Sequence, residues 1–506
     1  MLLDPRQLLP GRAKPPDDGP PPLGKANGST PTRANGSAPT KANGSAPAEA
    51  NGSATELRED WPVLPEEPER DRPNRRFYIP LPLKFAIVAA VSLGWVAFSI
   101  WLAIPWIVSL GASITVPVAA ALIAGIAIIP GYLNAHLVAS LLVDRPPPLR
   151  FDLDFPAITV VIACFNEEET VEETVDYICG NDYPGSVHVL VADDGSTDGT
   201  VERAQLAAEA DPKIEVRSFP HGGKARTLTA ALEHVKTPLV ATVDADTLVM
   251  PQSLKRAVAR LLVSPPTTVA VAGAVFVRNS RDNFITKAQE WDYFLGIASI
   301  KRQQGLMQGT LVAQGAFSVY RADALRGAGG WPDQIGEDIV LTWAMMKEGG
   351  GITYERTAVA FTGAPSKLRA LARQRRRWAR GMIEGLRAYG THLVRSRRSY
   401  SHGVVVNFGF PYIDFVYAIG FPVGIGLAMF GNFAIVGPLT LLVLPLNVLL
   451  SGFMFKLSSD SFKEVGLRVR RNPIGFLAYL FAYQLVMSPI SVYGYFQELF
   501  RAERRW

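Results

Sequence analysis

The sequence predicts an α/β domain with a mostly parallel sheet, flanked on both sides by transmembrane α-helices. Three observations predict this fold. Charge is almost absent from three stretches, strands alternate with helices between the first two of them, and polar motifs follow the strand ends. The 506-residue chain is 48% hydrophobic and only 19% charged, whereas soluble domains carry about 25% charge.

The uncharged stretches are long enough to cross a membrane. Residues 85–143 contain no Asp, Glu, Lys or Arg, residues 403–455 contain only Asp414, and residues 474–497 contain none. A membrane-spanning helix needs about 20 apolar residues, so these stretches hold about two, two and one spans. Buried helices of a soluble protein are the disfavoured alternative, and we expect an integral membrane protein.

Composition excludes several other classes. The formal charge of +5 is too small to indicate nucleic-acid binding. Cys164 and Cys179 are the only cysteines, which excludes a disulfide scaffold or a multi-cysteine zinc site. Residues 1–75 are rich in Pro, Gly, Ala and Ser, and repeat Ala-Asn-Gly-Ser every eight residues from Ala26. We expect this segment to be disordered and to contain no signal peptide.

Basic residues set the expected topology. They flank the predicted hairpin of residues 76–150, whereas the turn near Gly111 is uncharged. The positive-inside rule then places residues 151–380 on the cytoplasmic side of the inner (plasma) membrane. Three C-terminal spans in residues 403–506 would put Arg501, Arg504 and Arg505 outside, against that rule. A re-entrant stretch, a different count, or a break at Pro489 into a span and an interfacial piece would resolve the conflict.

Strands and helices alternate after residue 151. Strands are predicted at residues 158–163, 187–192, 214–218 and 239–243, with helices at 167–178 and 200–210. Such βαβ units form parallel sheets, whose ligands bind beyond the carboxyl ends of the strands.

Two acidic motifs fall at those ends. Asp193-Asp194-Gly195-Ser196 follows the second strand, and its carboxylates could bind a base or ribose or simply form a helix-capping turn. Asp244-Ala245-Asp246 follows the fourth strand. Two carboxylates on a short loop suit Mg²⁺ or Mn²⁺ that also bridges phosphate oxygens, and a solvated turn is the alternative.

Two further motifs lie downstream. Gly336-Glu337-Asp338 precedes a helix, so its acid either caps that helix or acts as a general base. Residues 366–402 hold eleven Lys or Arg and one acid, Glu384, which is typical of a membrane-surface segment. We expect residues 381–402 to form an amphipathic interfacial helix. Gln374 and Trp378 are four residues apart and share a helix face.

Together these motifs resemble one family. Their order and flanks from about Pro156 to Gly381 are similar to the membrane-embedded, processive family 2 glycosyltransferases, which include cellulose, chitin, hyaluronan and poly-N-acetylglucosamine synthases. The resemblance implies a GT-A fold and an inverting, UDP-sugar-dependent β-glycosyltransferase. Spans flanking the domain and the C-terminal aromatic residues lead to the further hypothesis of a polymer channel, and aromatic residues at a lipid interface are the alternative.

The resemblance also implies roles for individual residues. In the donor site, the uridine would be held by Ala163, Phe165, Glu167 and an acid of Asp193-Asp194, the diphosphate by Lys224, and the metal by Asp244 and Asp246. Asp338 would be the catalytic base beside Glu337. The acceptor and leaving nucleotide would contact Gln374, Arg377 and Trp378, and the acceptor sugar would rest on the loop containing Gly315.

The residues of these motifs resemble those of bacterial poly-β-1,6-N-acetylglucosamine synthases most closely. Hyaluronan-, chitin- and β-glucan-type polymers remain alternative products. The expected partners are a UDP-sugar, a growing polysaccharide, the lipid bilayer and small membrane or periplasmic accessory subunits, and nucleic acid is not expected. Two alternatives remain: a non-processive transferase that adds one sugar to a lipid, and a membrane scaffold or transporter with an inactive transferase fold.

Overall fold

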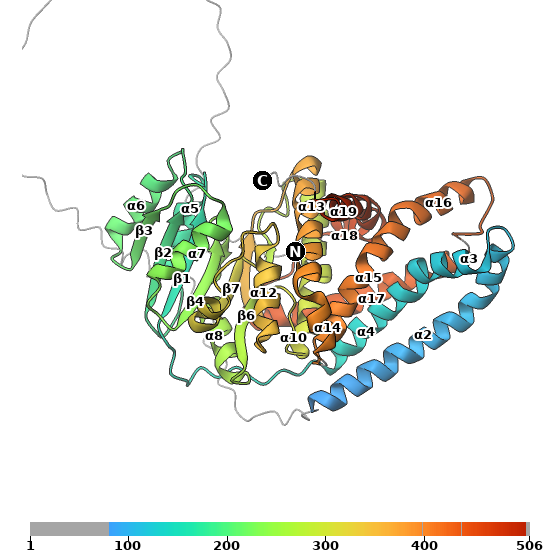
Figure 1. Ribbon diagram of the computed structural model, residues 1–506, viewed down its shortest axis with the longest axis horizontal. Helices are drawn as coiled ribbons and strands as arrows, with labels where there is room; N and C mark the ends of the chain where they lie inside the picture. Colours follow the sequence, from blue (N-terminus) through green and yellow to red (C-terminus); the bar gives the residue numbers. More distant parts are fainter. Residues whose placement is uncertain (1–79, 397, 437, 502–506) are drawn as a thin grey trace, which may run out of the picture.

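The computed structural model describes residues 80–396, 398–436 and 438–501, with the backbone alone for 438–447 (Figure 1). The low-complexity segment predicted over residues 1–75 lies outside the described residues, as do Arg504 and Arg505.

One eight-stranded sheet forms the centre of the domain between the membrane helices. Its strand order is β3-β2-β1-β4-β7-β6-β8-β5. Strands β1 to β4 are mutually parallel, whereas β7 runs antiparallel to both β4 and β6. The mostly parallel sheet is therefore confirmed. The strand bounds are β1 Ile158–Cys164, β2 Val187–Asp193, β3 Ile214–Ser218, β4 Leu239–Asp244, β5 Leu248–Val249, β6 Thr268–Val277, β7 Phe317–Arg321 and β8 Gly351–Thr362.

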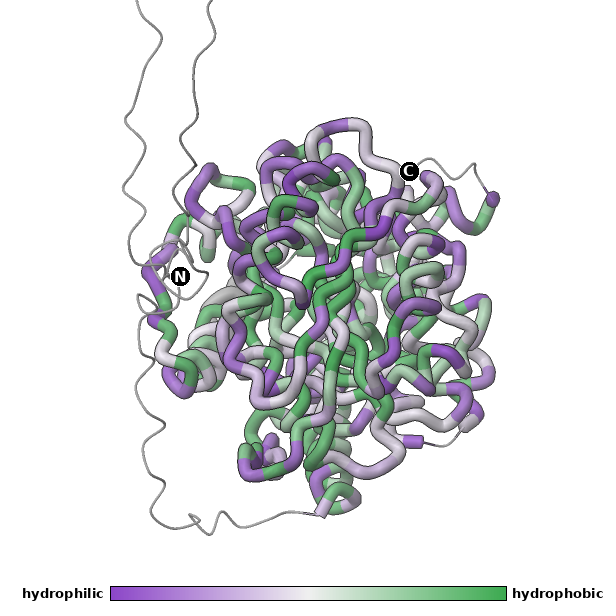
Figure 2. The backbone as a smooth tube through the Cα atoms, turned by 90° about the vertical axis from the view of Figure 1, so that its left-hand side faces the viewer, coloured by the Kyte–Doolittle hydropathy of each residue, from purple (hydrophilic) through white to green (hydrophobic). Residues whose placement is uncertain are grey.

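Both faces of the sheet are covered, because its strands are apolar on both sides. In β1, Val160 and Ile162 belong to one buried cluster and Val161 belongs to another on the opposite face. This two-sided burial explains the uninterrupted β-branched strand sequences. In Figure 2 the hydrophobic colour follows the central strands, and the hydrophilic colour gathers in the outer loops. The domain helices are α5 Val171–Cys179, α6 Thr200–Ala210, α7 Lys224–His234, α8 Ser253–Val263, α9 Phe284–Trp291, η3 Asp292–Ile297, α10 Ala298–Leu306, α11 Ala322–Gly327 and α12 Glu337–Lys347.

A long helix follows the domain. It comprises α13 Leu368–Gly385, η4 Leu386–Gly390 and α14 Thr391–Arg395, so the boundary expected at residues 380/381 falls inside it. Leu386 and Leu393 are 7% and 0% exposed and belong to the same buried cluster as Trp343 of α12. This apolar face therefore packs on the domain core, and the interfacial role of residues 381–402 stays a prediction.

Four described helices are long and apolar enough to cross a membrane: α2 Leu81–Gly111, α3–η2–α4 Val116–Val143, α15–η5–α16 Ser401–Met429 and α18–η6–α19 Pro473–Leu499. Helix α17 Pro438–Lys463 lies between the last two in sequence. Figure 1 shows α2, α4 and α15–α16 extending side by side away from the sheet.

Candidate active site

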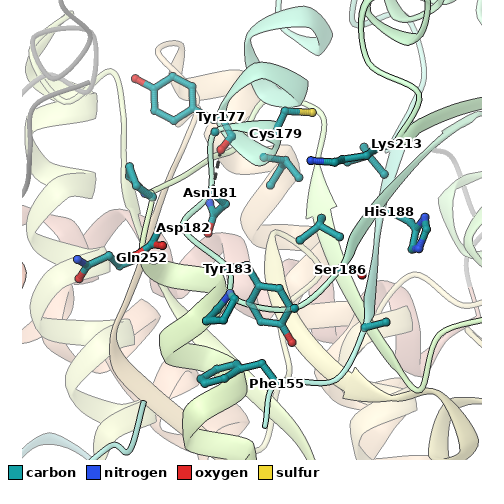
Figure 3. Close-up of a pocket in the computed structure, with 18 of the residues that line it drawn as sticks. Phe155, Tyr177, Cys179, Asn181, Asp182, Tyr183, Ser186, His188, Lys213 and Gln252 are labelled. Atoms are coloured by element: carbon teal, nitrogen blue, oxygen red, sulfur yellow. Dashed lines mark hydrogen bonds between the residues drawn. The ribbon is translucent and has the colours of Figure 1, made fainter. Parts of the chain in front are cut away.

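The predicted site residues on β1, β2 and β4 lie at the carboxyl ends of these parallel strands. In register, Cys164 of β1 lies opposite Asp193 of β2, and Ala163 of β1 lies opposite Asp244 of β4. A cavity of about 1070 Å³ lies at the other edge of the sheet, beside the start of β2, where Ser186 and His188 line it (Figure 3). That cavity is remote from the acidic motifs, which define the site.

The two acids of the first motif are both buried. Asp193 holds the loop that follows β2, and Asp194 holds the loop that follows β3. Asp194 accepts hydrogen bonds from the backbone N–H groups of Gly222 and Gly223, at 2.9 and 3.0 Å, and from the Thr227 hydroxyl at 2.7 Å. Asp193 accepts one from the backbone of Ser196 at 3.1 Å. Asp194 thereby positions the loop that precedes Lys224.

An aromatic pair borders this loop. The ring of Phe165, which is 43% exposed, stacks on the ring of His221 with centroids 4.4 Å apart. His221 also lies 3.0 Å from the Asp194 carboxylate through Nδ1. The sequence analysis did not select His221, although it lies only three residues before the predicted diphosphate-site residue Lys224.

The second acidic motif carries concentrated negative charge. Lys224 donates a hydrogen bond to Asp244, and Asp246 accepts from the hydroxyls of Thr362 and Thr247 at 3.0 and 3.2 Å. Burial and the neighbouring Asp244 raise the pKa of Asp246. Burial, Asp246 and Asp244 likewise raise the pKa of Glu167. An additional cation would therefore offset the repulsion between these carboxylates.

These residues fit a divalent ion held jointly with substrate. Carboxylate oxygens are the ligands that Mg²⁺ and Mn²⁺ prefer. In the described part of the chain, no three His, Cys, Asp or Glu side chains are grouped to hold an ion by themselves. An ion on Asp244 and Asp246 would thus complete its coordination with diphosphate oxygens and water.

The predicted acceptor loop reaches this point because β7 pairs with β4. Thr242 lies opposite Ser318 in that antiparallel pair. A Cβ atom on Gly315 would lie 2.8 Å from the Lys224 ammonium nitrogen and 3.8 Å from a carboxylate oxygen of Asp244. The loop backbone therefore lies directly beside Lys224 and Asp244, and a side chain at position 315 would displace the Lys224 ammonium group.

The candidate base lies at the start of α12. Asp338 accepts a hydrogen bond from the backbone of Ile339 at 2.7 Å. Burial raises the pKa of Asp338, although Lys224 and Lys301 oppose that rise. Burial and the adjacent Asp338 raise the pKa of Glu337 to about 7. A carboxylate with a raised pKa accepts a proton more readily, which suits a general base.

The loop before the acceptor segment is tied to the same helix. Ala313 N–H donates to the Thr342 hydroxyl at 2.9 Å, and that hydroxyl donates to the backbone carbonyl of Asp338 at 2.6 Å. The buried Lys301 ammonium donates to the carbonyl of Val312. These bonds join the acceptor loop and the candidate base into one unit.

Helix α13 contacts the start of α12 at a pair of glycines. A Cβ atom on Gly336 would lie 2.4 Å from the Cα of Gly381, so neither position has room for a side chain. The buried Glu384 accepts a hydrogen bond from the Gly336 N–H at 2.9 Å. The helix that carries Gln374, Arg377 and Trp378 thus positions the segment that carries Asp338.

Arg375, within the same motif, orients Trp378. Its guanidinium lies 4.1 Å from the centroid of the half-exposed Trp378 ring and 2.8 Å from the Asp292 carboxylate. The sequence analysis missed Arg375, Glu384 and Lys301. Glu384 is the lone acid of a basic stretch and could have been selected for that reason, whereas Lys301 has no comparable signal.

Comparison with known proteins agrees with this geometry. Residues 156–381 match the family model described as glycosyltransferase like family 2. The poly-β-1,6-N-acetyl-D-glucosamine synthase of Staphylococcus aureus strain COL is 31% identical over 244 residues, which cover 48% of this chain and 58% of that protein. The enzyme of the same name from Staphylococcus epidermidis is 30% identical over 238 residues, covering 45% and 55%. The chain thus spans a little over half the length of these relatives.

A solved mannosyltransferase from Pyrobaculum calidifontis, in complex with GDP-Man and Mn²⁺, superposes with a TM-score of 0.51 at 18% identity, covering 76% of this chain and 99% of that one. The likeness shows a shared fold. Residues 156–381 therefore match the family 2 glycosyltransferase model and have a GT-A-like fold, and apolar helices flank them on both sides.

Proposed function

We propose that this protein is an inverting, UDP-sugar-dependent synthase that elongates a poly-β-1,6-N-acetylglucosamine-like polysaccharide. The single observation that carries the proposal is the docking of α13 on the start of α12. It packs the helix that carries Gln374, Arg377 and Trp378 against the segment that carries Asp338, through the Gly336–Gly381 contact and the Glu384 hydrogen bond. The matches to synthases of that polymer support the choice of product.

In the proposed reaction, Asp338 takes the proton of an acceptor hydroxyl while that oxygen attacks the anomeric carbon of the donor sugar. The bond from this carbon to the diphosphate breaks on the opposite face, so an α-linked donor yields a β-linked product. One carboxylate suffices because the nucleotide leaves without needing a proton. Lys224 and Arg377 would hold the negative charge of the departing UDP.

A Mg²⁺ or Mn²⁺ ion on Asp244 and Asp246 would neutralise the diphosphate as a Lewis acid. The Mn²⁺ bound by the Pyrobaculum calidifontis mannosyltransferase supports this assignment. The proposed location is the inner (plasma) membrane, with several spans and the catalytic domain in the cytoplasm.

The direct test supplies the purified full-length chain with UDP-N-acetylglucosamine, UDP-glucose or UDP-glucuronate and either metal. Release of UDP and the size of the product are measured. Long polymer from UDP-N-acetylglucosamine supports the proposal. A single sugar on lipid, polymer only from another donor, or no transfer overturns it.

Asp338→Asn tests the base. It should lower the turnover number at least 100-fold while UDP still binds. Asp333→Asn is the matched control, because Asp333 lies five residues earlier and is half-exposed on a surface pair with Arg226. Full activity of Asp338→Asn would overturn the assignment.

A further inference from the structure

Asp292 is the first residue of η3 and belongs to none of the motifs that predicted the site. We propose that Asp292 is a positioning residue for the acceptor: through Arg375 it holds the ring of Trp378, and it thereby sets how long a growing polymer remains bound. The inference rests on the proposed function, because it places the acceptor against Trp378. Asp292 then controls the length of the product without touching it.

Asp292 and Arg375 form a buried ion pair. A guanidinium nitrogen of Arg375 lies 2.8 Å from a carboxylate oxygen of Asp292, and the two side chains are 10% and 14% exposed. Among the residues that the structure describes, Asp292 is the only carboxylate paired with Arg375. Removal of one partner from a buried pair leaves the other charge uncompensated. The guanidinium therefore keeps its place because the Asp292 carboxylate is there.

The same guanidinium lies over three aromatic rings, of which Trp378 is the nearest. Its central carbon lies 4.1 Å from the Trp378 centroid, against 5.9 Å for Tyr293 and 5.8 Å for Tyr483. Tyr293 and Tyr483 are 6% and 8% exposed, whereas Trp378 is 42% exposed. Trp378 is therefore the ring of this cluster that a substrate can reach, and the cation–π contact ties its position to that of Arg375.

The Asp292 carboxylate is itself held from two sides. The Tyr483 hydroxyl donates a hydrogen bond to one of its oxygens at 3.0 Å. A Cβ atom on Gly296, one turn further along η3, would lie 2.9 Å from the other oxygen. The carboxylate therefore has little room to move, so Arg375 and Trp378 are placed before any substrate binds. Such preorganisation lowers the cost of ordering these side chains on binding.

The start of η3 also lies near the proposed metal site. Burial raises the pKa of Tyr293 to about 12, and the carboxylates of Asp246 and Asp244 contribute to that rise. The Tyr293 ring also lies 6.4 Å from the Trp378 ring, centroid to centroid. This turn therefore neighbours both the exposed Trp378 ring and the carboxylates proposed to bind the metal.

The position of Trp378 bears on processivity, because a processive enzyme adds sugars only while the acceptor stays bound. The mean number of sugars added in one binding event is the ratio of the transfer rate to the dissociation rate. Changes in affinity within one interface act mainly on the dissociation rate. Displacement of Trp378 should therefore shorten the polymer, while the donor site and Asp338 still carry out each transfer.

Asp292→Asn in the full-length chain tests this role. UDP-N-acetylglucosamine and an excess of short N-acetylglucosamine oligosaccharides are supplied, and polymer length and UDP release are measured. We expect polymer about tenfold shorter, a higher KM for the oligosaccharide, and a loss of turnover below about threefold at saturating oligosaccharide. Asp292→Glu, which keeps the charge, should restore most of the length. Asp282→Asn is the matched control, since Asp282 is exposed and accepts a hydrogen bond only from the nearby Asn279 side chain.

Two further variants test the route through Arg375. Arg375→Met removes the guanidinium, and Arg375→Met combined with Asp292→Asn removes both buried charges, which proteins often tolerate. If Asp292 acts through Arg375, these two variants make equally short polymer. Further shortening in the double variant, full-length polymer from Asp292→Asn, or a loss of turnover as large as the loss of length would overturn the inference alone. No transfer by the unchanged chain would overturn the proposed function, and this inference with it.

Discussion

Gly381→Ala tests whether the docking of α13 sets the position of Asp338, the proposed catalytic base. A Cβ atom at residue 381 would lie 2.6 Å from the Gly336 Cα and 3.1 Å from the Gly336 backbone nitrogen. Both neighbours are backbone atoms that cannot rotate away. Ordinary contact begins near 3.4 Å, so the start of α12, with Asp338, must move by about 0.8 Å.

The expected loss is larger in turnover than in stability. A misplacement of about 1 Å at a reacting group can cost about 100-fold in rate, so we expect a 10- to 100-fold lower turnover number. Overpacking costs about 1–3 kcal/mol, and replacing a helical glycine by alanine recovers about 1 kcal/mol. The net loss of unfolding free energy should therefore be about 0–2 kcal/mol.

Gly385→Ala is the matched control, one turn further along α13. A Cβ atom there would lie 3.5 Å from Ile339 and 3.6 Å from Trp343, which is ordinary packing distance. UDP release and UDP affinity are measured for both variants, because the proposed nucleotide contacts include the ends of β1, β2 and β4 as well as Arg377 of α13. Unchanged turnover in Gly381→Ala, or an equal loss in Gly385→Ala, would refute the reasoning.

Three further predictions follow from neighbouring groups. Glu384→Ala removes the acceptor of the buried Gly336 N–H and should cost about 1–3 kcal/mol of unfolding free energy. Glu348→Ala, which changes an exposed carboxylate, is the control in thermal unfolding. Equal losses of stability in the two variants would contradict the role of Glu384. Burial lowers the pKa of Lys301 to about 8. Between that pH and about 10.5 the unfolded chain binds a proton that the folded chain does not, so stability should rise with pH in this window, by about 3 kcal/mol at most. Lys301→Met should lack this rise, and a rise of equal size in the variant would exclude Lys301 as its source. Because Lys301 also opposes the raised pKa of Asp338, the same variant should move the acidic limb of the turnover–pH profile to higher pH, and a shift to lower pH would contradict the assigned base.

Much of the architecture follows from local sequence because its causes are local. The run Ile158–Ala163 is apolar except for Thr159 and shows no alternation of polar and apolar residues, which is typical of a strand buried on both faces. Polar residues at the strand ends then mark the ligand edge, since parallel strands bring their carboxyl ends together. This reasoning selects Asp193 and Asp244, and the structure places both at that edge.

The remaining site residues depend on contacts between distant segments. Lys301 acts on the pKa of Asp338 because α10 bonds to the loop before β7, and that loop bonds to α12. No spacing in the sequence indicates these contacts. Glu384 and Gly336 are 48 residues apart and meet only because two glycines let α13 and α12 approach closely. Packing of this kind is a property of pairs of surfaces, which a one-dimensional pattern does not contain.

In the membrane helices, too, composition and tertiary structure determine different properties. Charge depletion by itself determined that residues 85–143, 403–455 and 474–497 are apolar enough for a bilayer, because transfer free energy depends on composition and length. Direction is not encoded in composition. Only the tertiary structure decided that α18–η6–α19 touches the glycosyltransferase domain at Asn472 and again at Glu498. Those two contacts place both ends of a helix of span length against one domain, and neither its length nor its composition reports that.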